Sequence, residues 1–143
     1  MNWEVRFDSL QATTRPDIIR REPQWHHATW HYINEPYFPT EADREALQGH
    51  ITDNLSRDVP KAGEDIERMN AIQAFKYNLD RFRSVDTSDR DKAVALCWIL
   101  HIGGDLHQPL HTTAMFTTAL PQGDRGGNTI KLTGSSAKNL HAA

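Results

Sequence analysis

The sequence predicts an all-α fold, a mainly helical single domain with long irregular loops, and three observations point to it. Apolar residues between Pro60 and Phe82 recur every three or four positions over about five turns, the period of a helix with one face on a core. The run Ala93–Leu100 is apolar on all sides, which is typical of a helix buried at the centre of a domain. The 143 residues suffice for one domain, spanning residues 1–143.

The N-terminal part combines an interrupted helix with an irregular loop. Residues 8–22 suggest a helix whose pattern is broken by Pro16, which places Asp17 near a helical first turn, where an acidic side chain is favoured even without a ligand role. Residues 23–39 are rich in Trp, His, Tyr and Pro and have no helical period. We therefore expect a loop over the core, of the kind that commonly lines functional sites.

Two amphipathic helices are expected next. The first opens at Thr40, where the sequence resembles a capping box, and runs to about Arg57 with a thin apolar side. The second starts at Pro60 and carries the clearest apolar stripe in the chain. Its large apolar residues, such as Met69 and Phe75, are far more typical of a core than of a ligand site.

A fourth helix is expected to begin near Asp89, where Thr87 or Ser88 can cap it, and to carry the apolar run. Pro109 has no amide hydrogen and disfavours helical geometry at Gln108, so we expect the helix to end there.

The remainder is expected to be mostly loop. Residues 114–127 contain Pro121 and three glycines, and a short strand is expected at Thr129–Leu132. The pair Gly126–Gly127 lacks the spacing of a nucleotide-binding loop. Residues 137–143 resemble the opening of a helix.

Bulk properties exclude several classes of function. A net charge of -3 and a pI near 6.2 give no general attraction for nucleic acid, which argues against a plain nucleic-acid-binding module. The single cysteine, Cys97, lies in the apolar run and is expected to be a small core residue. No stretch approaches the roughly 20 apolar residues of a membrane helix, and the first residues lack signal-peptide features, so taken alone the sequence indicates a cytosolic protein.

Ionisable side chains that follow the apolar run predict a metal site. His101 and Asp105 are four positions apart, so on a helix they lie on one face, close enough to hold one cation. His111 comes just past the expected helix end, where it can turn back toward the same face. Such a pair is often only a hydrogen-bonded pair. Burial of these groups without partners would be costly, however, which favours coordination here.

Four segments, in order, resemble the signatures of one enzyme family. They are Thr14–Arg20, Trp30–Asn34, His101–His111, and Gly123–Asn128 followed by Asn139–His141. In sequence and spacing they resemble the zinc-dependent single-strand nucleases, the S1/P1 nuclease family, which shares a fold with the zinc-dependent bacterial phospholipases C. The resemblance reaches from about residue 12 to the last residue and implies the same mainly helical fold.

The resemblance implies a set of zinc ligands, which are Asp17, His31, His101, Asp105, His111 and His141. The first four would hold one ion and the last two a second. In relatives, a later aspartate completes the second site, and an N-terminal tryptophan with a nearby histidine holds a third ion that Asp105 bridges. Those residues have no match in the sequence. We therefore expect one complete zinc site, where the family has up to three, and a fragment of a longer protein.

Other motif positions imply how the substrate is handled. Arg20 matches an arginine that steadies the phosphate beside the metals, and we expect it to be catalytic together with Asp105. Tyr32 matches the aromatic residue on which the family stacks a nucleobase, and Asn34, which replaces an aspartate of fungal members, would also bind substrate. His26–His27 lie outside the motif and are expected to be exposed.

The function implied is that of a zinc-dependent endonuclease of single-stranded DNA and RNA, with 3′-nucleotidase action as a second activity. The resemblance implies a nucleic-acid or nucleotide substrate, no stable protein partner, no membrane, a monomer, and a secreted or periplasmic location. Two alternatives stay open: a zinc-dependent phospholipase C, and a catalytically inactive zinc-binding helical fragment. Tyr32 and Arg20 favour the nuclease over the phospholipase.

Overall fold

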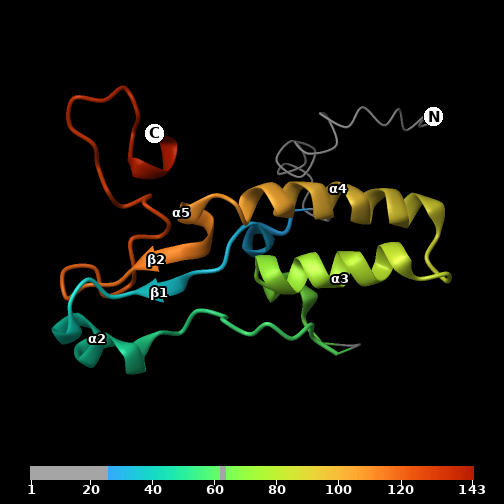
Figure 1. Ribbon diagram of the computed structural model, residues 1–143, viewed down its shortest axis with the longest axis horizontal. Coiled ribbons are helices and arrows are strands. Elements are labelled where there is room, and N and C mark those ends of the chain that lie inside the picture. Colours follow the sequence, from blue (N-terminus) through green and yellow to red (C-terminus); the bar gives the residue numbers. More distant parts are fainter. Residues whose placement is uncertain (1–25, 62–63) are drawn as a thin grey trace.

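The computed structural model describes residues 26–61 and 64–143, and in this part the chain is mainly helical (Figure 1). The predicted all-α class is confirmed, with a small sheet added. The helices and strands in chain order are β1 Glu35–Tyr37, α2 Glu41–Leu47, α3 Ala71–Arg83, α4 Asp89–Asp105, α5 Pro109–Thr112 and β2 Thr113–Met115. Single 3₁₀ turns are η3 Ala28–His31, η4 Gln48–His50, η5 Ile66–Arg68 and η6 Leu140–Ala142. The helix expected within residues 8–22 lies outside the described residues.

Helices α3 and α4 lie side by side and enclose the main core (Figure 1). The Asn70 side chain accepts the Gln73 amide hydrogen while Gln73 reaches back to the Asn70 amide, which makes a capping box at the start of α3. Ser88 caps α4 by accepting the amide hydrogen of Asp91, as one of the two expected caps. The buried residues of this core are Trp30, Met69, Ala71, Ala74, Trp98 and Ile102.

Helix α2 is shorter than predicted. Thr40 caps it through the amide of Asp43, as the sequence suggested, but the helix ends at Leu47 instead of near Arg57. The thin apolar side explains the difference, because a short helix is stable only where it has a face to bury. The buried end of α2 joins a second, smaller core cluster of Leu47, Ala114 and Phe116.

Helix α3 also begins later than predicted, at Ala71 instead of Pro60. The Asn70 side-chain amide donates to the backbone carbonyls of Asn54 and Ser56, each at 2.8 Å. These bonds tie a non-helical segment to the start of α3, so the helix cannot extend backwards through it. Of the predicted apolar stripe, Met69 just before the cap is fully buried and Phe75 packs against the same core while partly buried. The stripe does not continue to the end of α3 as expected, because Phe82 is 39% exposed.

The small sheet was not expected. Strands β1 and β2 pair in parallel, with Pro36 opposite Ala114. By contrast, the strand expected at Thr129–Leu132 is wrong, because this segment is loop and the Ile130 carbonyl accepts the amide hydrogen of Leu140. Three-residue strands carry too little alternation to be recognised in a sequence. The sheet matters for the site, because it joins the chain just after η3 to the chain just after α5.

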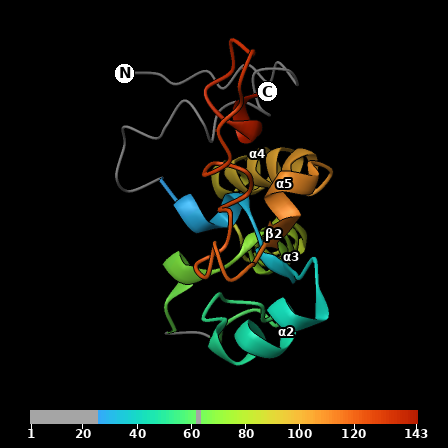
Figure 2. The same cartoon turned by 90° about the vertical axis from the view of Figure 1, so that its left-hand side faces the viewer.

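Helix α4 is buried on one side only, so the prediction of burial on all sides is wrong. Its buried residues are Ala95, Trp98, His101 and Ile102, whereas Leu100 is 41% exposed. Its neighbours α3 and η3 cover one side. In Figure 2, α3 and β2 lie between α4 above and α2 below. In the described ranges, no helix combines the length and apolarity needed to cross a membrane.

Candidate metal centre

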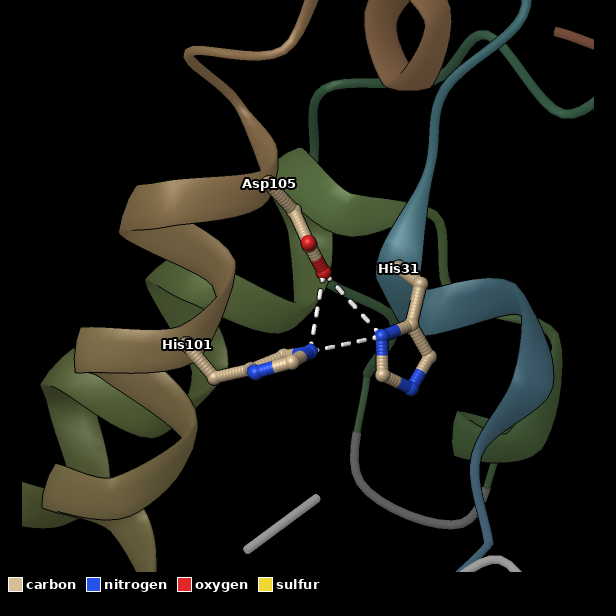
Figure 3. A group of neighbouring side chains, drawn as sticks. All are labelled: His31, His101 and Asp105. Carbon is tan, nitrogen blue, oxygen red and sulfur yellow. Dashed lines mark hydrogen bonds and ion pairs between the residues drawn. The ribbon is translucent and has the colours of Figure 1, made fainter. Parts of the chain in front are cut away.

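Three side chains from two distant segments converge on one point (Figure 3). The Nε2 atom of His101 lies 2.8 Å from Nδ1 of His31 and 3.1 Å from Oδ2 of Asp105. Nδ1 of His31 lies 3.0 Å from the same carboxylate oxygen. The site therefore has two imidazole nitrogens and one carboxylate oxygen within contact distance of one another.

Helix α4 supplies two of these groups because of its period. His101 and Asp105 are one turn apart, so both side chains point from the same face of the last turn of α4 toward His31. The helix ends at Asp105, earlier than the Gln108 expected, and Pro109 begins the separate helix α5. Because the ligand pair occupies the last turn, the following chain is free to bring a third group back to Asp105.

His31 is held by the core. It ends the turn η3, whose Trp30 is 3% exposed and donates its indole hydrogen to the Ile66 carbonyl at 3.0 Å. The ring of Trp98 meets both His31 and His101, with ring centroids 5.6 and 6.2 Å away. The two imidazoles are therefore oriented by a buried aromatic surface rather than by solvent-exposed contacts.

The donor set fits zinc. Histidine nitrogen and aspartate oxygen are preferred zinc ligands, and ligands at about 2.1 Å in a tetrahedron lie about 3.4 Å apart. The three observed separations are 2.8, 3.0 and 3.1 Å, so the donor atoms need to spread by only a few tenths of an ångström. Nε2 of His31, the ring nitrogen outside this group, is buried without a hydrogen-bond partner in the described part of the chain.

Electrostatics keep Asp105 in the form that binds a cation. Burial by itself would raise the pKa of Asp105, but hydrogen bonds with His101, His111 and His31 and the charge of His101 outweigh it. The pKa of Asp105 therefore lies well below its ordinary value. The hydrogen bond with Asp105 raises the pKa of His111, against the effect of burial. The carboxylate is therefore ionised at neutral pH.

His111 and His141 form a second group beside this one. Nδ1 of His111 lies 3.2 Å from Asp105 Oδ1 and donates to the His31 carbonyl at 2.9 Å. Nδ1 of His141 donates to the Gly126 carbonyl at 2.8 Å, and the two rings stack with centroids 5.1 Å apart. In the neutral rings, Nε2 then carries the lone pair, which is the arrangement of a histidine held ready as a metal ligand.

A pocket of about 760 Å³ opens over these histidines. Its described lining is His26, Ala28, His31, Tyr32, Asn34, Leu110, His111, Arg125, Gly126, Asn128 and His141. Tyr32 is 39% exposed, and the Asn34 side chain donates to Asp53 at 2.7 Å. The pocket thus brings together two expected substrate residues and three expected ligands. Asp17 and Arg20 lie outside the described residues.

The expectation that His26 and His27 are both exposed is wrong. His27 is 9% exposed, stacks on Trp30 with centroids 3.8 Å apart, and lies 2.8 Å from the Glu67 carboxylate. His26 is partly buried and lines the pocket. The physical reason is the turn η3, which folds this segment against the core. The spacing of three between His27 and Trp30 is a signal that could have indicated the turn, because residues three apart share one side of a 3₁₀ helix.

Comparisons with known proteins agree on one family. A family model described as S1/P1 nuclease matches residues 3–143. Endonuclease 1 of Arabidopsis thaliana is 33% identical over 146 residues, covering 96% of this chain and 41% of the relative. Endonuclease 5 of the same plant is 29% identical, covering 88% of this chain and 38% of the relative. The chain spans about two fifths of the length of these relatives. No solved structure matches it.

Proposed function

Because the chain belongs to the S1/P1 nuclease family, we propose that it acts as a zinc-dependent endonuclease that hydrolyses phosphodiester bonds of single-stranded DNA and RNA, with 3′-nucleotidase activity as a second reaction. The observation that carries the proposal is the convergence of His31, His101 and Asp105. The chain matches about two fifths of the length of its relatives. The activity is therefore proposed for the whole protein. A secreted or periplasmic location and action as a monomer belong to the same proposal.

The site residues divide into two ligand groups. His31, His101 and Asp105 would hold one zinc ion together with Asp17, and His111 with His141 would hold part of a second site next to Asp105. When bound, zinc polarises a phosphoryl oxygen and makes hydroxide available near neutral pH. The low pKa of Asp105 keeps its carboxylate charged throughout this range. The carbonyls of His31 and Gly126 orient the rings of His111 and His141.

The pocket supports a nucleic-acid substrate. Tyr32 presents an exposed ring beside the histidines, and stacking of a base on such a ring contributes about 1–3 kcal/mol. A base must be unstacked from its neighbours to lie there, which favours single strands over duplexes. Asn34 can offer a base edge both a donor and an acceptor, while Asp53 fixes the orientation of its amide. Arg20 would steady the phosphate.

Hydrolysis of a labelled single-stranded oligonucleotide tests the proposal. Activity should disappear with a chelator and return with zinc, and Asp105→Asn should lower the rate by about 100-fold or more, because it removes the charged ligand shared by the cluster. Asp89→Asn, an exposed position at the other end of α4, is the matched control and should retain full activity. Undiminished cleavage in chelator, or by Asp105→Asn, would contradict the proposal. Tight zinc binding without any cleavage would indicate the inactive domain instead.

A further inference from the structure

Arg125 has an unusual backbone conformation at the edge of the pocket. Its φ is 56°, and it is followed by Gly126 and Gly127 with φ of 61° and 78°. Glycine adopts this left-handed region readily, but a residue with a long side chain does so at a cost in free energy. Such a conformation persists only where the surroundings impose it, and it is found preferentially at functional sites.

The surroundings do impose it. Asp124 is 5% exposed, and its Oδ1 accepts the amide hydrogens of Met115 and Gly126, each at 3.1 Å. The Asn128 side chain donates to the Arg125 carbonyl at 2.8 Å. Gly126 passes so close to the Leu110 carbonyl that a side chain at this position would collide with it. The backbone at Arg125 is therefore fixed against β2 and against α5, the helix that carries His111.

The environment of the Arg125 guanidinium indicates what it binds. It has no ion-pair partner among residues 26–61 and 64–143. The described lining of the pocket contains four histidines, no carboxylate, and Arg125 as its one permanently charged residue. The chain as a whole carries a net charge of -3, so the described lining of this pocket differs in charge from the chain's average.

We propose that Arg125 binds a phosphate of the substrate chain next to the phosphate that is cleaved. This inference rests on the proposed function and deepens it. The planar guanidinium can donate two parallel hydrogen bonds to a phosphate, so it suits this contact better than a lysine. A fixed backbone lowers the entropy lost when the contact forms. Arg125 is thus a binding residue that selects chains of nucleotides over substrates with a single phosphate.

Arg125→Gly tests this without endangering the fold, because glycine prefers the left-handed backbone and the variant should be as stable as the wild type or more stable. We expect the KM for a single-stranded oligothymidylate to rise about tenfold, equivalent to about 1.4 kcal/mol, with kcat within about twofold. The kinetics on bis(4-nitrophenyl) phosphate, which has one phosphate, should not change. Arg125→Lys should keep part of the affinity.

Salt dependence and a charge-matched control complete the test. Arg125→Gly should reduce the slope of log affinity against log salt by about 0.7, the value for one contact with a single strand. Arg90→Ala removes the same charge from the exposed first turn of α4 and should change neither KM nor the slope. Equal losses on both substrates, an unchanged oligothymidylate KM, or an equal effect of Arg90→Ala would overturn the inference.

Binding separates this inference from the proposed function. If the wild-type chain cleaves neither substrate, the proposed function fails, and oligothymidylate binding measured by fluorescence anisotropy in chelator then judges Arg125. A tenfold weaker Kd for Arg125→Gly supports the phosphate contact in that case. An unchanged Kd overturns it.

Discussion

At the scale of single residues, Asp105 joins the two histidine groups of the site. One carboxylate oxygen contacts His31 and His101, and the other contacts His111. The four-residue spacing of His101 and Asp105 could be used from the sequence because both lie on one helix. The contacts of His31 with His101 and Asp105 could not be predicted from spacing, because they join residues 70 or more positions apart. Only the resemblance to a family motif indicated them.

Asp43 offers a test by pH away from the site. Its carboxylate accepts hydrogen bonds from the Thr40 hydroxyl at 2.6 Å and the Thr118 amide at 2.9 Å, which lower its pKa. A lowered folded-state pKa stabilises the fold above the unfolded value of about 3.9, and this contribution is lost as the pH falls through the folded value. Asp43→Asn should therefore unfold at lower urea than the wild type at pH 6, and this difference should shrink progressively below about pH 3.9.

Glu45→Gln is the control for this measurement, because Glu45 is an exposed carboxylate on the same helix. Its urea midpoint should stay close to that of the wild type across the same pH range. A difference in urea midpoint between the wild type and Asp43→Asn that does not change with pH would show that the Asp43 charge does not contribute to stability.

At the scale of elements, caps could be read from the sequence more reliably than burial. The start of α4 at Ser88 follows from a serine before an apolar run, and Asn70 with Gln73 has the spacing of a capping box that could have placed α3 correctly. Composition alone cannot show which residues of α4 face a neighbouring element. The exposure of Leu100 therefore could not be predicted from its apolar surroundings in the sequence.

Two substitutions on α4 test this one-sided burial. Ile102→Ala should lower the free energy of unfolding by about 2–5 kcal/mol, because Ile102 is 0% exposed in the main core and its removal leaves a cavity. Leu100→Ala, two positions away and 41% exposed, should cost less than about 1 kcal/mol. Urea unfolding in the presence of a chelator gives both values. Similar losses from the two variants would mean that both sides of α4 are buried in solution.

At the scale of the whole molecule, the fold assembles one site from four separate segments. The turn η3 carries His31, the end of α4 carries His101 and Asp105, α5 carries His111, and η6 carries His141. The parallel pairing of β1 with β2 ties two of these segments together. Helix period predicted the pair on α4, but the meeting of the other segments depends on loops and three-residue strands whose paths leave no periodic pattern.

Anomalous diffraction from crystals grown with zinc tests the central claim most directly, because it locates the ion itself. We expect a zinc peak within about 2.0–2.2 Å of Nδ1 of His31, Nε2 of His101 and Oδ2 of Asp105. A crystal in which zinc binds elsewhere, or not at all, while these three side chains remain bonded to one another would contradict the account.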